Sequence, residues 1–479
     1  MFPRKAKLGA PTCSPIPPGP YSISAWFAGT WRHVVQLSFN PLPFLDSLQQ
    51  YGDLSYFRMF KIRAFAPNHP DLVREVLTTQ RHRLRKLPRD TRAVSQLTGR
   101  GILVTEGDEW LRQRRMIQPA FQPRHLASFA RPIAEETERM LDRWEPGTIV
   151  DMADEMADLT MKMAARMILG VRLDERADLV SGARILSEAF ISENRTILRL
   201  PDWVPLPHQR RKRWAMALYD QFLRETIAER RLNPHEGDDV LSLLLKAVDV
   251  EGDGRGMTDE QARDEAMTLF TAAFHANSMA LAFTLYLLTQ HADVEEKLLE
   301  EIDGASRGSV LGPADLSRLP YTQMVVKESL RLYPPAWALF TREVTEEFEL
   351  GGYRLRPGNW VMVFPYLLHR NERLFADPTR FDPSRFAPDR EQQIPQYGYI
   401  PYGGGPRVCI GNTMSSMQLP LILANVLRRC RLRLAHPEQR LRIQASLALR
   451  PRGGLPMTIE MREPSKLAPP ALQRSSAAE

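Results

Sequence analysis

Segment 402–411 reads YGGGPRVCIG and presents a single cysteine, Cys409, after a glycine- and proline-rich turn. Glycines let the backbone turn tightly, so that its N–H groups can point at a thiolate. Arg407, two residues earlier, adds positive charge that favours the deprotonated sulfur. Gly411, two residues later, leaves space beside the sulfur for a flat ligand. The pattern predicts a thiolate that binds a ligand, whereas a lone cysteine is more often a small buried apolar residue.

The segment resembles the haem-binding signature of the cytochrome P450 family, in which an aromatic residue is followed by two positions, Gly, any residue, Arg, any residue, Cys, any residue and Gly. The chain departs from this pattern only by having Tyr402 where the family usually has Phe. The resemblance implies that Cys409 is the axial ligand of a haem b iron, a thiolate that favours O–O cleavage. It also implies a mainly α fold with a minor β region and a long central helix over the haem.

A second pattern lies upstream. Glu328 and Arg331 are three residues apart in a predicted helix that ends at Pro334-Pro335, so they share a face and can pair. Alone, such a pair is common on solvated helices. With the prolines it resembles the family's Glu-x-x-Arg helix, and Arg385, within FDPSRF at 381–386, resembles the arginine that completes a Glu–Arg–Arg network. The resemblance implies that these three charged residues are structural and hold the cysteine loop in place.

The cofactor's carboxylates also need partners. Trp110 and Arg114 are one helical turn apart, so an indole N–H and a guanidinium can meet one carboxylate. This resembles the family's Trp-x-x-x-Arg pair that holds haem propionates, although a surface arginine beside a core tryptophan has the same spacing. Arg342 and Arg407 occupy positions where relatives also hold propionates. The predicted cofactor contacts are therefore Trp110, Arg114, Arg342, Tyr402, Arg407 and Gly411.

A long helix is predicted in the middle of the chain. Thr258 with Gln261 forms a capping box, and no Gly or Pro interrupts residues 257–303. Within it, segment 266–288 is apolar enough to suggest a membrane span. Polar residues in its middle, His275 among them, would be costly in lipid. We therefore predict a buried core helix.

This helix departs from the family where protons are handled. Most relatives carry Ala-Gly-x-acid-Thr, whose acid and hydroxyl relay protons to dioxygen. Aligned on ALAF at 280–283, the chain has His275 at the acid position and Ala276 at the threonine position, whereas a shift of one residue puts Asn277 there. Neither alignment gives an acid–hydroxyl pair. His275, Ala276 and Asn277 are the candidate catalytic residues.

Three hypotheses follow. His275 is a substitute proton donor, because imidazole titrates near neutral pH. Alternatively, water or a substrate hydroxyl supplies the proton. In the third hypothesis the enzyme uses peroxide or catalyses oxidative coupling. A satisfied core histidine remains the alternative for His275.

The predicted substrate pocket is mostly apolar. Thr268, Ala272 and Ala276 repeat every four residues and should line the distal side of the haem. Such a lining favours a lipophilic small molecule, and fatty acids, terpenoids, polyketides and macrocycles all stay open. The other candidate lining residues are Leu97, Leu103, Phe190, Phe270, Trp337, Leu339 and Leu455.

Composition limits the class of protein. The chain has 479 residues, 43% of them hydrophobic, and a net charge of +7 that is not clustered as in a nucleic-acid-binding arm. Its three cysteines, Cys13, Cys409 and Cys430, form no disulfide framework and suit a reducing cytoplasm. Helical periodicity dominates residues 126–169, 181–232 and 257–303, and strand patterns occur at 51–67 and 348–364.

Three regions are expected: a proline-rich N-terminal segment at 1–39, a single haem-thiolate catalytic domain at 40–462 and a disordered tail at 463–479. Residues 1–20 contain no apolar run long enough for a signal peptide or membrane anchor. We therefore expect a cytoplasmic monomer of the soluble bacterial type, without a transmembrane anchor.

The sequence predicts a haem-thiolate monooxygenase that inserts one oxygen atom from O2 into a lipophilic substrate, by hydroxylation or epoxidation. Electrons would come from a ferredoxin or flavodoxin with its reductase, so NAD(P)H would act only indirectly. The docking face would be basic, near Arg112, Arg115 and Arg407. A peroxygenase or oxidative-coupling enzyme is the alternative. A haem sensor or carrier fits less well, because it needs neither a substrate cavity nor a fixed thiolate loop.

Overall fold

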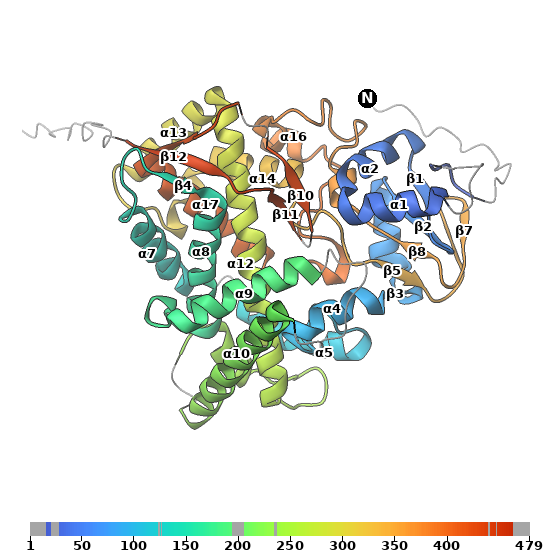
Figure 1. Ribbon diagram of the computed structural model, residues 1–479, viewed down its shortest axis with the longest axis horizontal. Helices are drawn as coiled ribbons and strands as arrows, with labels where there is room; N and C mark the ends of the chain where they lie inside the picture. Colours follow the sequence, from blue (N-terminus) through green and yellow to red (C-terminus); the bar gives the residue numbers. More distant parts are fainter. Residues whose placement is uncertain are drawn as a thin grey trace, which may run out of the picture.

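A large helical body and a smaller strand-containing region make up the computed structural model (Figure 1). The strands of the smaller region lie at one end of the molecule, beside α1 and α2. The prediction of a mainly α fold with a minor β region is confirmed. The structure describes residues 16–20, 28–122, 125, 127–193, 206–233, 237–438, 441–446 and 448–462.

The described helices pack around α12 and vary in length from one turn to nine. They are α1 (Ala28–Phe39), α2 (Pro41–Leu48), α3 (Pro70–Arg74), α4 (Pro88–Thr98), α5 (Gly107–Ile117), α7 (Ala130–Leu141), α8 (Met152–Ala164), α9 (Ala177–Glu193), α10 (Pro207–Leu232), α11 (Val240–Lys246), α12 (Asp259–Gln290), α13 (Ala292–Ser306), α14 (Pro320–Leu332), α15 (Pro365–Leu368), α16 (Pro388–Glu391) and α17 (Asn412–Arg429).

The described strands are short. They are β1 (Leu54–Met59), β2 (Ile62–Pro67), β3 (Leu84–Lys86), β4 (Ile149–Asp151), β5 (Arg342–Val344), β6 (Phe348–Leu350), β7 (Tyr353–Leu355), β8 (Trp360–Val361), β9 (Cys430–Leu434), β10 (Ile443–Ala445), β11 (Leu449–Pro451) and β12 (Pro456–Met461). The main sheet has the order β1-β2-β8-β5-β3, and a second sheet has the order β4-β12-β9.

The main sheet joins segments that are far apart in the sequence. β1 and β2 form an antiparallel hairpin, as the pattern at 51–67 predicts, and β2 pairs in parallel with β8. β3 pairs with β5 in a register that sets Lys86 opposite Arg342. Two cations are thus brought together by strand pairing alone.

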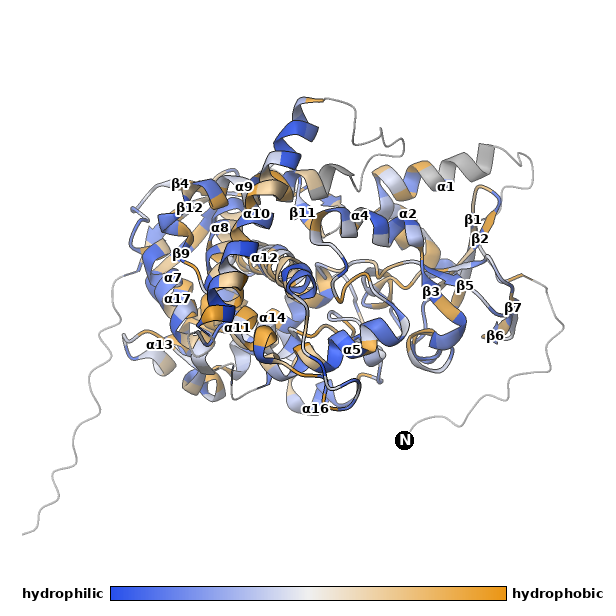
Figure 2. Cartoon of the chain, turned by 90° about the horizontal axis from the view of Figure 1, so that it is seen from below, coloured by the Kyte–Doolittle hydropathy of each residue, from blue (hydrophilic) through white to orange (hydrophobic). Residues whose placement is uncertain are grey.

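Helix α12 runs through the centre of the helical body (Figures 1 and 2). Its N-terminus carries the predicted capping box, in which Thr258 accepts from the backbone N–H of Gln261 and Gln261 accepts from that of Thr258. The helix packs against α8, α10, α14 and α17. In the described part of the chain only α12 is long and apolar enough to cross a membrane, and most of its apolar stretch is buried inside the fold. It is a core helix, as predicted.

The folded body begins before residue 40. Helix α1 lies within the segment predicted as proline-rich, and its buried His33 contacts the rings of Phe44 and Phe57. The backbone N–H of Tyr56 donates to the carbonyl of Pro18 at 3.0 Å. The described parts of this segment, residues 16–20 and 28–39, therefore pack against the catalytic region. Residues 463–479, predicted to be a disordered tail, lie outside the described residues.

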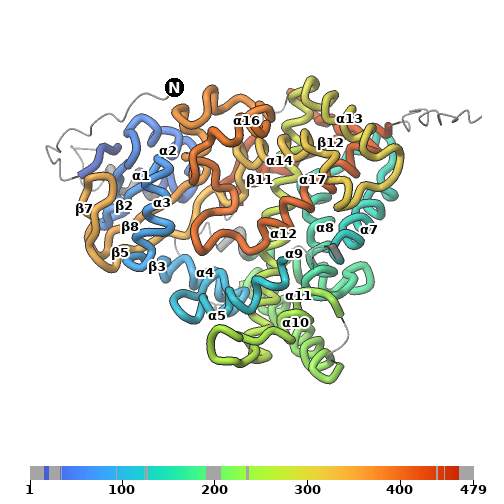
Figure 3. The backbone as a smooth tube through the Cα atoms, turned by 180° about the vertical axis from the view of Figure 1, so that it is seen from behind, coloured from blue at the N-terminus to red at the C-terminus, as the bar shows by residue number. Residues whose placement is uncertain are grey.

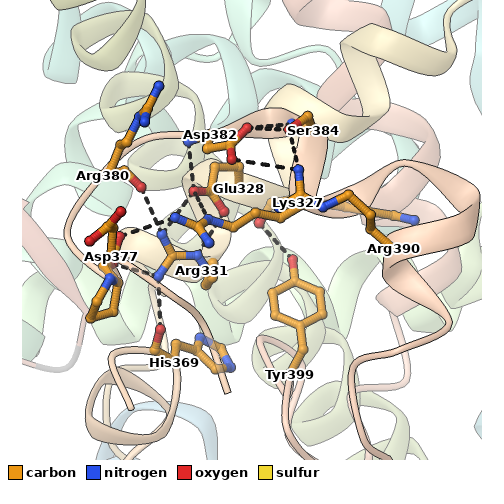
Figure 4. Close-up of polar contacts among 12 residues, drawn as sticks. Lys327, Glu328, Arg331, His369, Asp377, Arg380, Asp382, Ser384, Arg390 and Tyr399 are labelled. Carbon is orange, nitrogen blue, oxygen red and sulfur yellow. Dashed lines mark hydrogen bonds and ion pairs between the residues drawn. The ribbon is translucent and has the colours of Figure 1, made fainter. Parts of the chain in front are cut away.

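A fully buried ion pair fixes the segment that leads to the cysteine loop (Figure 4). Arg331 donates to both oxygens of Glu328, at 2.7 and 2.8 Å, and neither side chain is exposed. Glu328 also accepts from Arg385 at 3.3 Å and from the backbone N–H of Asp382 at 2.9 Å. The three charged residues that sequence patterns single out are in contact.

The remaining donors of Arg331 bind backbone carbonyls. They reach His369 at 2.8 Å, Pro378 at 2.7 Å and Arg380 at 3.1 Å. The ring of His369 in turn accepts from the backbone N–H of Ile400 at 2.8 Å, shortly before the cysteine loop. One guanidinium therefore ties together a stretch of irregular backbone that could not otherwise satisfy its buried carbonyls.

We expect Glu328→Ala to lower the free energy of unfolding by about 3–5 kcal/mol, because it leaves the guanidinium of Arg331 buried without its carboxylate. Urea unfolding followed by circular dichroism measures the loss. Arg131→Ala is the matched control: Arg131 and its partner Glu135 form a surface pair, and Arg131 is 83% exposed. The control should cost no more than about 1 kcal/mol. Equal losses in the two variants would contradict the structural role of Glu328.

Candidate active site

The cysteine loop is a tight turn between Ile400 and α17. The backbone N–H of Cys409 donates to the carbonyl of Tyr402 at 2.9 Å and closes the turn. Gly403 and Gly405 adopt φ values of 72° and 68°, which side chains disfavour. A Cβ atom on Gly405 would also lie 2.5 Å from the carbonyl oxygen of Leu77. Both glycines are required by the backbone path.

Solvent reaches the side chain of Cys409, although protein atoms fill much of the space around the sulfur. This enclosure raises the pKa of its thiol, against two opposing contacts: a hydrogen bond from the backbone N–H of Gly411 and the positive charge of Arg114. Arg114 also donates to the carbonyl of Val408 at 2.9 Å. The cation beside the sulfur is therefore Arg114, whereas Arg407, for which this role was predicted, lies over the ring of Trp110.

The space beside the sulfur stays open. A Cβ atom on Gly411 would meet only the ring of Phe121, at 4.0 Å, among the residues that the structure describes. Cys430, by contrast, is fully buried and donates to the carbonyl of Val426, and burial raises its pKa to about 12. It is an ordinary core residue. Cys13 lies outside the described residues.

Hydrogen bonds connect the cysteine loop to α12. The hydroxyl of Tyr402 donates to Ser415 at 3.2 Å, and Ser415 donates to Asn277 at 2.8 Å. Asn277 is buried and donates to Gln418 of α17 at 3.2 Å. The side chain of Asn277 therefore faces α17, and its predicted alternative role in place of the threonine is not supported by this geometry.

Two alanines of α12 are accessible within a stretch whose other residues are buried or half-buried. Ala272 and Ala276 lie one turn apart and are both exposed, whereas Phe274 and Asn277 between and beside them are buried. Figure 3, from behind, shows the chain leading into α17 crossing over α12, and α12 and α17 are in contact. The accessible cysteine and the accessible alanines are thus on neighbouring elements. Of the two residues predicted for the threonine position, Ala276 is exposed and Asn277 is buried.

His275 is half-buried and stacks on Phe274, with ring centroids 4.2 Å apart. Desolvation, and then the positive charge of Arg450, lowers its pKa to about 4. At neutral pH the imidazole is therefore uncharged. This disfavours the hypothesis of an imidazolium donor, although a neutral ring still carries one N–H.

A buried group of cations lies beside the cysteine loop. Burial and the charge of Arg407 lower the pKa of Lys86 to about 7 and that of Arg342 to about 10, while Glu106 opposes both shifts. Arg342 is half-buried, and its buried Nη1 has no hydrogen-bond partner among the described contacts. Such a site favours additional carboxylates, because each would relieve repulsion and satisfy a donor.

Lys86 was missed by the sequence analysis. Its ammonium donates to the carbonyls of Leu103 and Thr105 at 2.6 and 3.3 Å. Lys86 lies opposite Arg342 only because β3 pairs with β5, and no local sequence pattern predicts that pairing.

The predicted cofactor contacts of α5 are arranged differently from expectation. Trp110 and Arg114 were predicted to meet one carboxylate, but the guanidinium of Arg407 lies over the ring of Trp110, 4.3 Å from its centroid. Arg407 also donates to the carbonyl of Thr105 at 2.9 Å. Arg114 instead reaches the cysteine loop. Trp110 therefore positions Arg407, and Arg114 acts on the thiolate.

The predicted pocket residues are dispersed. Leu97 is buried in α4, and Leu103 is half-buried in the following loop. Trp337 donates to the carbonyl of Ser446 at 2.7 Å and stacks on Phe364. These contacts place Trp337 beside the tip of the β10–β11 hairpin.

One pocket prediction needs correction. Phe270 is 1% exposed and packs on Tyr219 of α10 and on Phe274, so it is a core residue on another face of α12 than Ala272. Leu455, also predicted to line the pocket, is buried; its backbone N–H donates to the side chain of Asp151, and its carbonyl accepts from the backbone N–H of Met152.

Two further pocket predictions concern residues at the edges of what the structure describes. Leu339 is half-buried, 3.8 Å from the Cβ position of Gly403 in the cysteine loop. Phe190 belongs to α9, but its side chain lies outside the described part.

The predicted docking arginines on α5 are already paired. Arg115 binds both oxygens of Asp249, at 2.7 and 2.6 Å. Arg112 contacts Asp253 at 3.3 Å and donates to the carbonyl of Gly256 at 2.9 Å. An acidic loop at 249–256 thus offsets two of the positive charges predicted for this face.

The comparisons with known proteins agree with this geometry. The cytochrome P450 family model matches residues 17–456, nearly the whole chain. The chain belongs to the cytochrome P450 family. This P450 therefore uses a cysteine-ligated haem iron and receives its electrons from redox partners, as the family does.

Its relatives include bacterial monooxygenases. The chain is 36% identical over 430 residues to a cyclooctat-9-en-7-ol 5-monooxygenase of Streptomyces melanosporofaciens, covering 89% of this chain and 92% of the relative. It is 30% identical over 407 residues to a pentalenene oxygenase of Streptomyces avermitilis, covering 83% and 88%. This P450 is an oxidoreductase of the monooxygenase type.

A solved structure shows the same fold. The haem domain of cytochrome P450DA superimposes with a TM-score of 0.83, covering 94% of this chain and 98% of that one at 24% sequence identity. The long central helix and the minor β region are therefore those of the cytochrome P450 fold.

The residues around Cys409 fit a haem. The accessible thiol matches an iron ligand, and the two accessible alanines leave room for a flat macrocycle. The Nη1 donor of Arg342, which has no partner in the described part of the chain, matches an acidic side group. When bound, the haem supplies the chemistry that activates dioxygen.

We expect Cys409→Ser to abolish the strongly red-shifted Soret band of the reduced carbon-monoxide complex, because a serine oxygen cannot replace the thiolate. The difference spectrum of the reduced, CO-treated variant against wild type measures this. Cys430→Ser is the matched control and should keep the band, since Cys430 is a core residue. Retention of the band in Cys409→Ser would contradict the assignment of the axial ligand.

Proposed function

We propose that this P450 inserts one oxygen atom from O2 into a polycyclic terpenoid, by hydroxylation or epoxidation, in the cytoplasm. The relatives that cover most of the chain and are named for terpenoid oxygenation carry this proposal. The accessible alanines of α12 support it, because small side chains leave room for a bulky apolar skeleton. For hydroxylation the balance is a C–H bond, O2, two electrons and two protons giving an alcohol and water.

The residues would divide the work as follows. Cys409 ligates the iron, with Arg114 and the backbone N–H of Gly411 holding negative charge on the sulfur. Arg342 and Lys86 would bind the haem propionates. Arg407, held by Trp110, would add a third cation at the same edge.

Proton supply is the least usual part of this proposal. Ala276 has no hydroxyl, Asn277 faces α17 and His275 is uncharged at neutral pH. We infer that water or a hydroxyl of the substrate delivers the protons. A peroxygenase or oxidative-coupling reaction is the second candidate, because the same missing acid–hydroxyl pair favours a reaction with less need of delivered protons.

The electron donor is proposed to be a ferredoxin or flavodoxin with its reductase, so that NAD(P)H acts only indirectly. Because Asp249 and Asp253 pair with the arginines of α5, a donor at this face would have to displace the acidic loop or dock beside it. The enzyme itself is proposed to act as a monomer.

Substrate oxidation under three conditions tests the function. Cyclooctat-9-en-7-ol and pentalenene are offered to the holoenzyme with ferredoxin, reductase and NADPH, with hydrogen peroxide, or with neither. Lauric acid serves as a non-terpenoid control. We expect products heavier by one oxygen from a terpenoid, with the label of ¹⁸O2, in the ferredoxin system. Product formed with peroxide alone would favour the peroxygenase, and no product from either terpenoid would contradict the proposal.

The proton hypothesis predicts the behaviour of two variants. Ala276→Thr should crowd the pocket and lower substrate affinity without raising the product formed per reducing equivalent. His275→Ala should leave that ratio unchanged, because an uncharged, stacked imidazole contributes packing. If His275 were the donor, its removal would instead slow turnover by ~10²-fold or more and release more peroxide.

A further inference from the structure

Two polar groups on α12 are buried without a complete set of partners. Glu265 is fully buried, and its Oε2 accepts from the backbone N–H of Ile102 at 2.9 Å. Its other oxygen, Oε1, has no hydrogen-bond partner among the described residues, and the same holds for the hydroxyl of Thr268, which is 2% exposed. Buried polar atoms are ordinarily satisfied, so this pair calls for a bound group.

Both residues lie near the face of α12 that carries the exposed Ala272 and Ala276, on its N-terminal side. At 100° per residue, Glu265 is about 60° from Thr268 and about 20° from Ala272 around the helix axis. At 1.5 Å per residue, Ala272 is about 6 Å beyond Thr268 and about 10 Å beyond Glu265. A ligand lying along α12 could therefore contact the polar pair at one end and the accessible alanines at the other.

The loop after α4 closes over this pair. A Cβ atom on Gly101 would collide with the hydroxyl of Thr268, so only glycine leaves room there. The backbone N–H of Arg100 donates to Asp264 at 2.6 Å, and that of Ile102 donates to Glu265. The loop is thus fastened to α12 by two carboxylates, and it continues into the half-buried Leu103 of the predicted pocket.

The carboxyl of Glu265 is able to donate as well as accept. Burial, together with the negative charges of Asp264 and Glu109, raises its pKa to about 8, whereas the hydrogen bond from Ile102 acts in the opposite direction. At neutral pH the group is mainly protonated. A hydrocarbon gives such a carboxyl and a threonine hydroxyl nothing to bind, but an alcohol supplies both a donor and an acceptor.

We propose that Glu265 and Thr268 form a subsite that binds an oxygen function, a hydroxyl or a carbonyl, already present on the substrate. The inference rests on the proposed function and narrows it, because the enzyme would act on a terpenoid that is already oxygenated. The reaction that supplies its substrate must then be one that installs that oxygen, such as an earlier hydroxylation or a cyclisation ended by water.

The test compares two ligands that differ by one hydroxyl. Spectral titration of the holoenzyme gives Kd values for cyclooctat-9-en-7-ol and for the hydrocarbon of the same skeleton without the hydroxyl. We expect wild type to bind the alcohol about tenfold or more tightly than the hydrocarbon. Thr268→Val and Glu265→Met should each remove most of that preference by weakening alcohol binding, and should change the Kd of the hydrocarbon less than about threefold.

Conservative variants and distant controls separate recognition from packing. Thr268→Ser and Glu265→Gln keep a hydrogen-bonding group and should retain the preference. Glu260→Gln, at an exposed acid of the same helix, and Thr289→Val, near its far end, should behave as wild type. Thr268→Val removes no charge and adds no bulk, so it decides the matter even if Glu265→Met folds poorly.

Equal affinity of wild type for the two ligands would overturn the inference and leave the pair as a site for buried water. A loss of affinity for both ligands in Thr268→Val would also overturn it, because it would mark a packing role. Failure of wild type to bind either ligand would contradict the terpenoid function itself. The two proposals can therefore fail separately.

Discussion

The ion pair between Glu328 and Arg331 is the contact on which the position of the cysteine depends. Burying two full charges is costly, and mutual attraction alone seldom compensates. Here the desolvation is offset by further hydrogen bonds, because Arg331 also binds the carbonyls of His369, Pro378 and Arg380. Those carbonyls belong to irregular backbone that no helix or sheet would organise. The ion pair therefore holds a long loop in one conformation. The position of the Cys409 thiolate depends on that conformation.

Electrostatics around the loop follow from the same arrangement. The loop brings Cys409 within the field of Arg114 and sets Arg407 on the ring of Trp110, next to Lys86 and Arg342. Several cations share one carboxylate, Glu106, so this part of the protein holds an excess of buried positive charge. A cofactor with two carboxylates complements this group, because its negative charges would offset the repulsion among the cations.

Local sequence patterns predicted what local contacts determine. The capping box of α12, the Glu328–Arg331 spacing and the glycine turn before Cys409 all concern residues close in sequence, and the structure has each of them. Long-range strand pairing could not be predicted from local patterns, and Lys86 lies opposite Arg342 only because of the register between β3 and β5. Helical periodicity over 126–169 predicted one continuous helical region, but α7 and α8 are separated by a turn that contains Glu145, Pro146 and Gly147 and by β4. Phe270 was misplaced because the neighbours of a helix face are set by other helices.

Helix α12 keeps the length and the central position typical of the fold, but its polar residues stand at other positions than in most relatives. At the positions predicted to align with the family's acid and hydroxyl, it has a stacked imidazole and an alanine, and the neighbouring amide of Asn277 is hydrogen-bonded to α17. Unsatisfied polarity appears instead two to three turns earlier, at Glu265 and Thr268. In the proposed substrate pocket, the part near Ala276 is therefore apolar and the part near Glu265 and Thr268 is polar. Such a distribution suits a substrate whose oxygen lies away from the carbon that reacts, since the apolar end then excludes bulk water while the polar end fixes orientation.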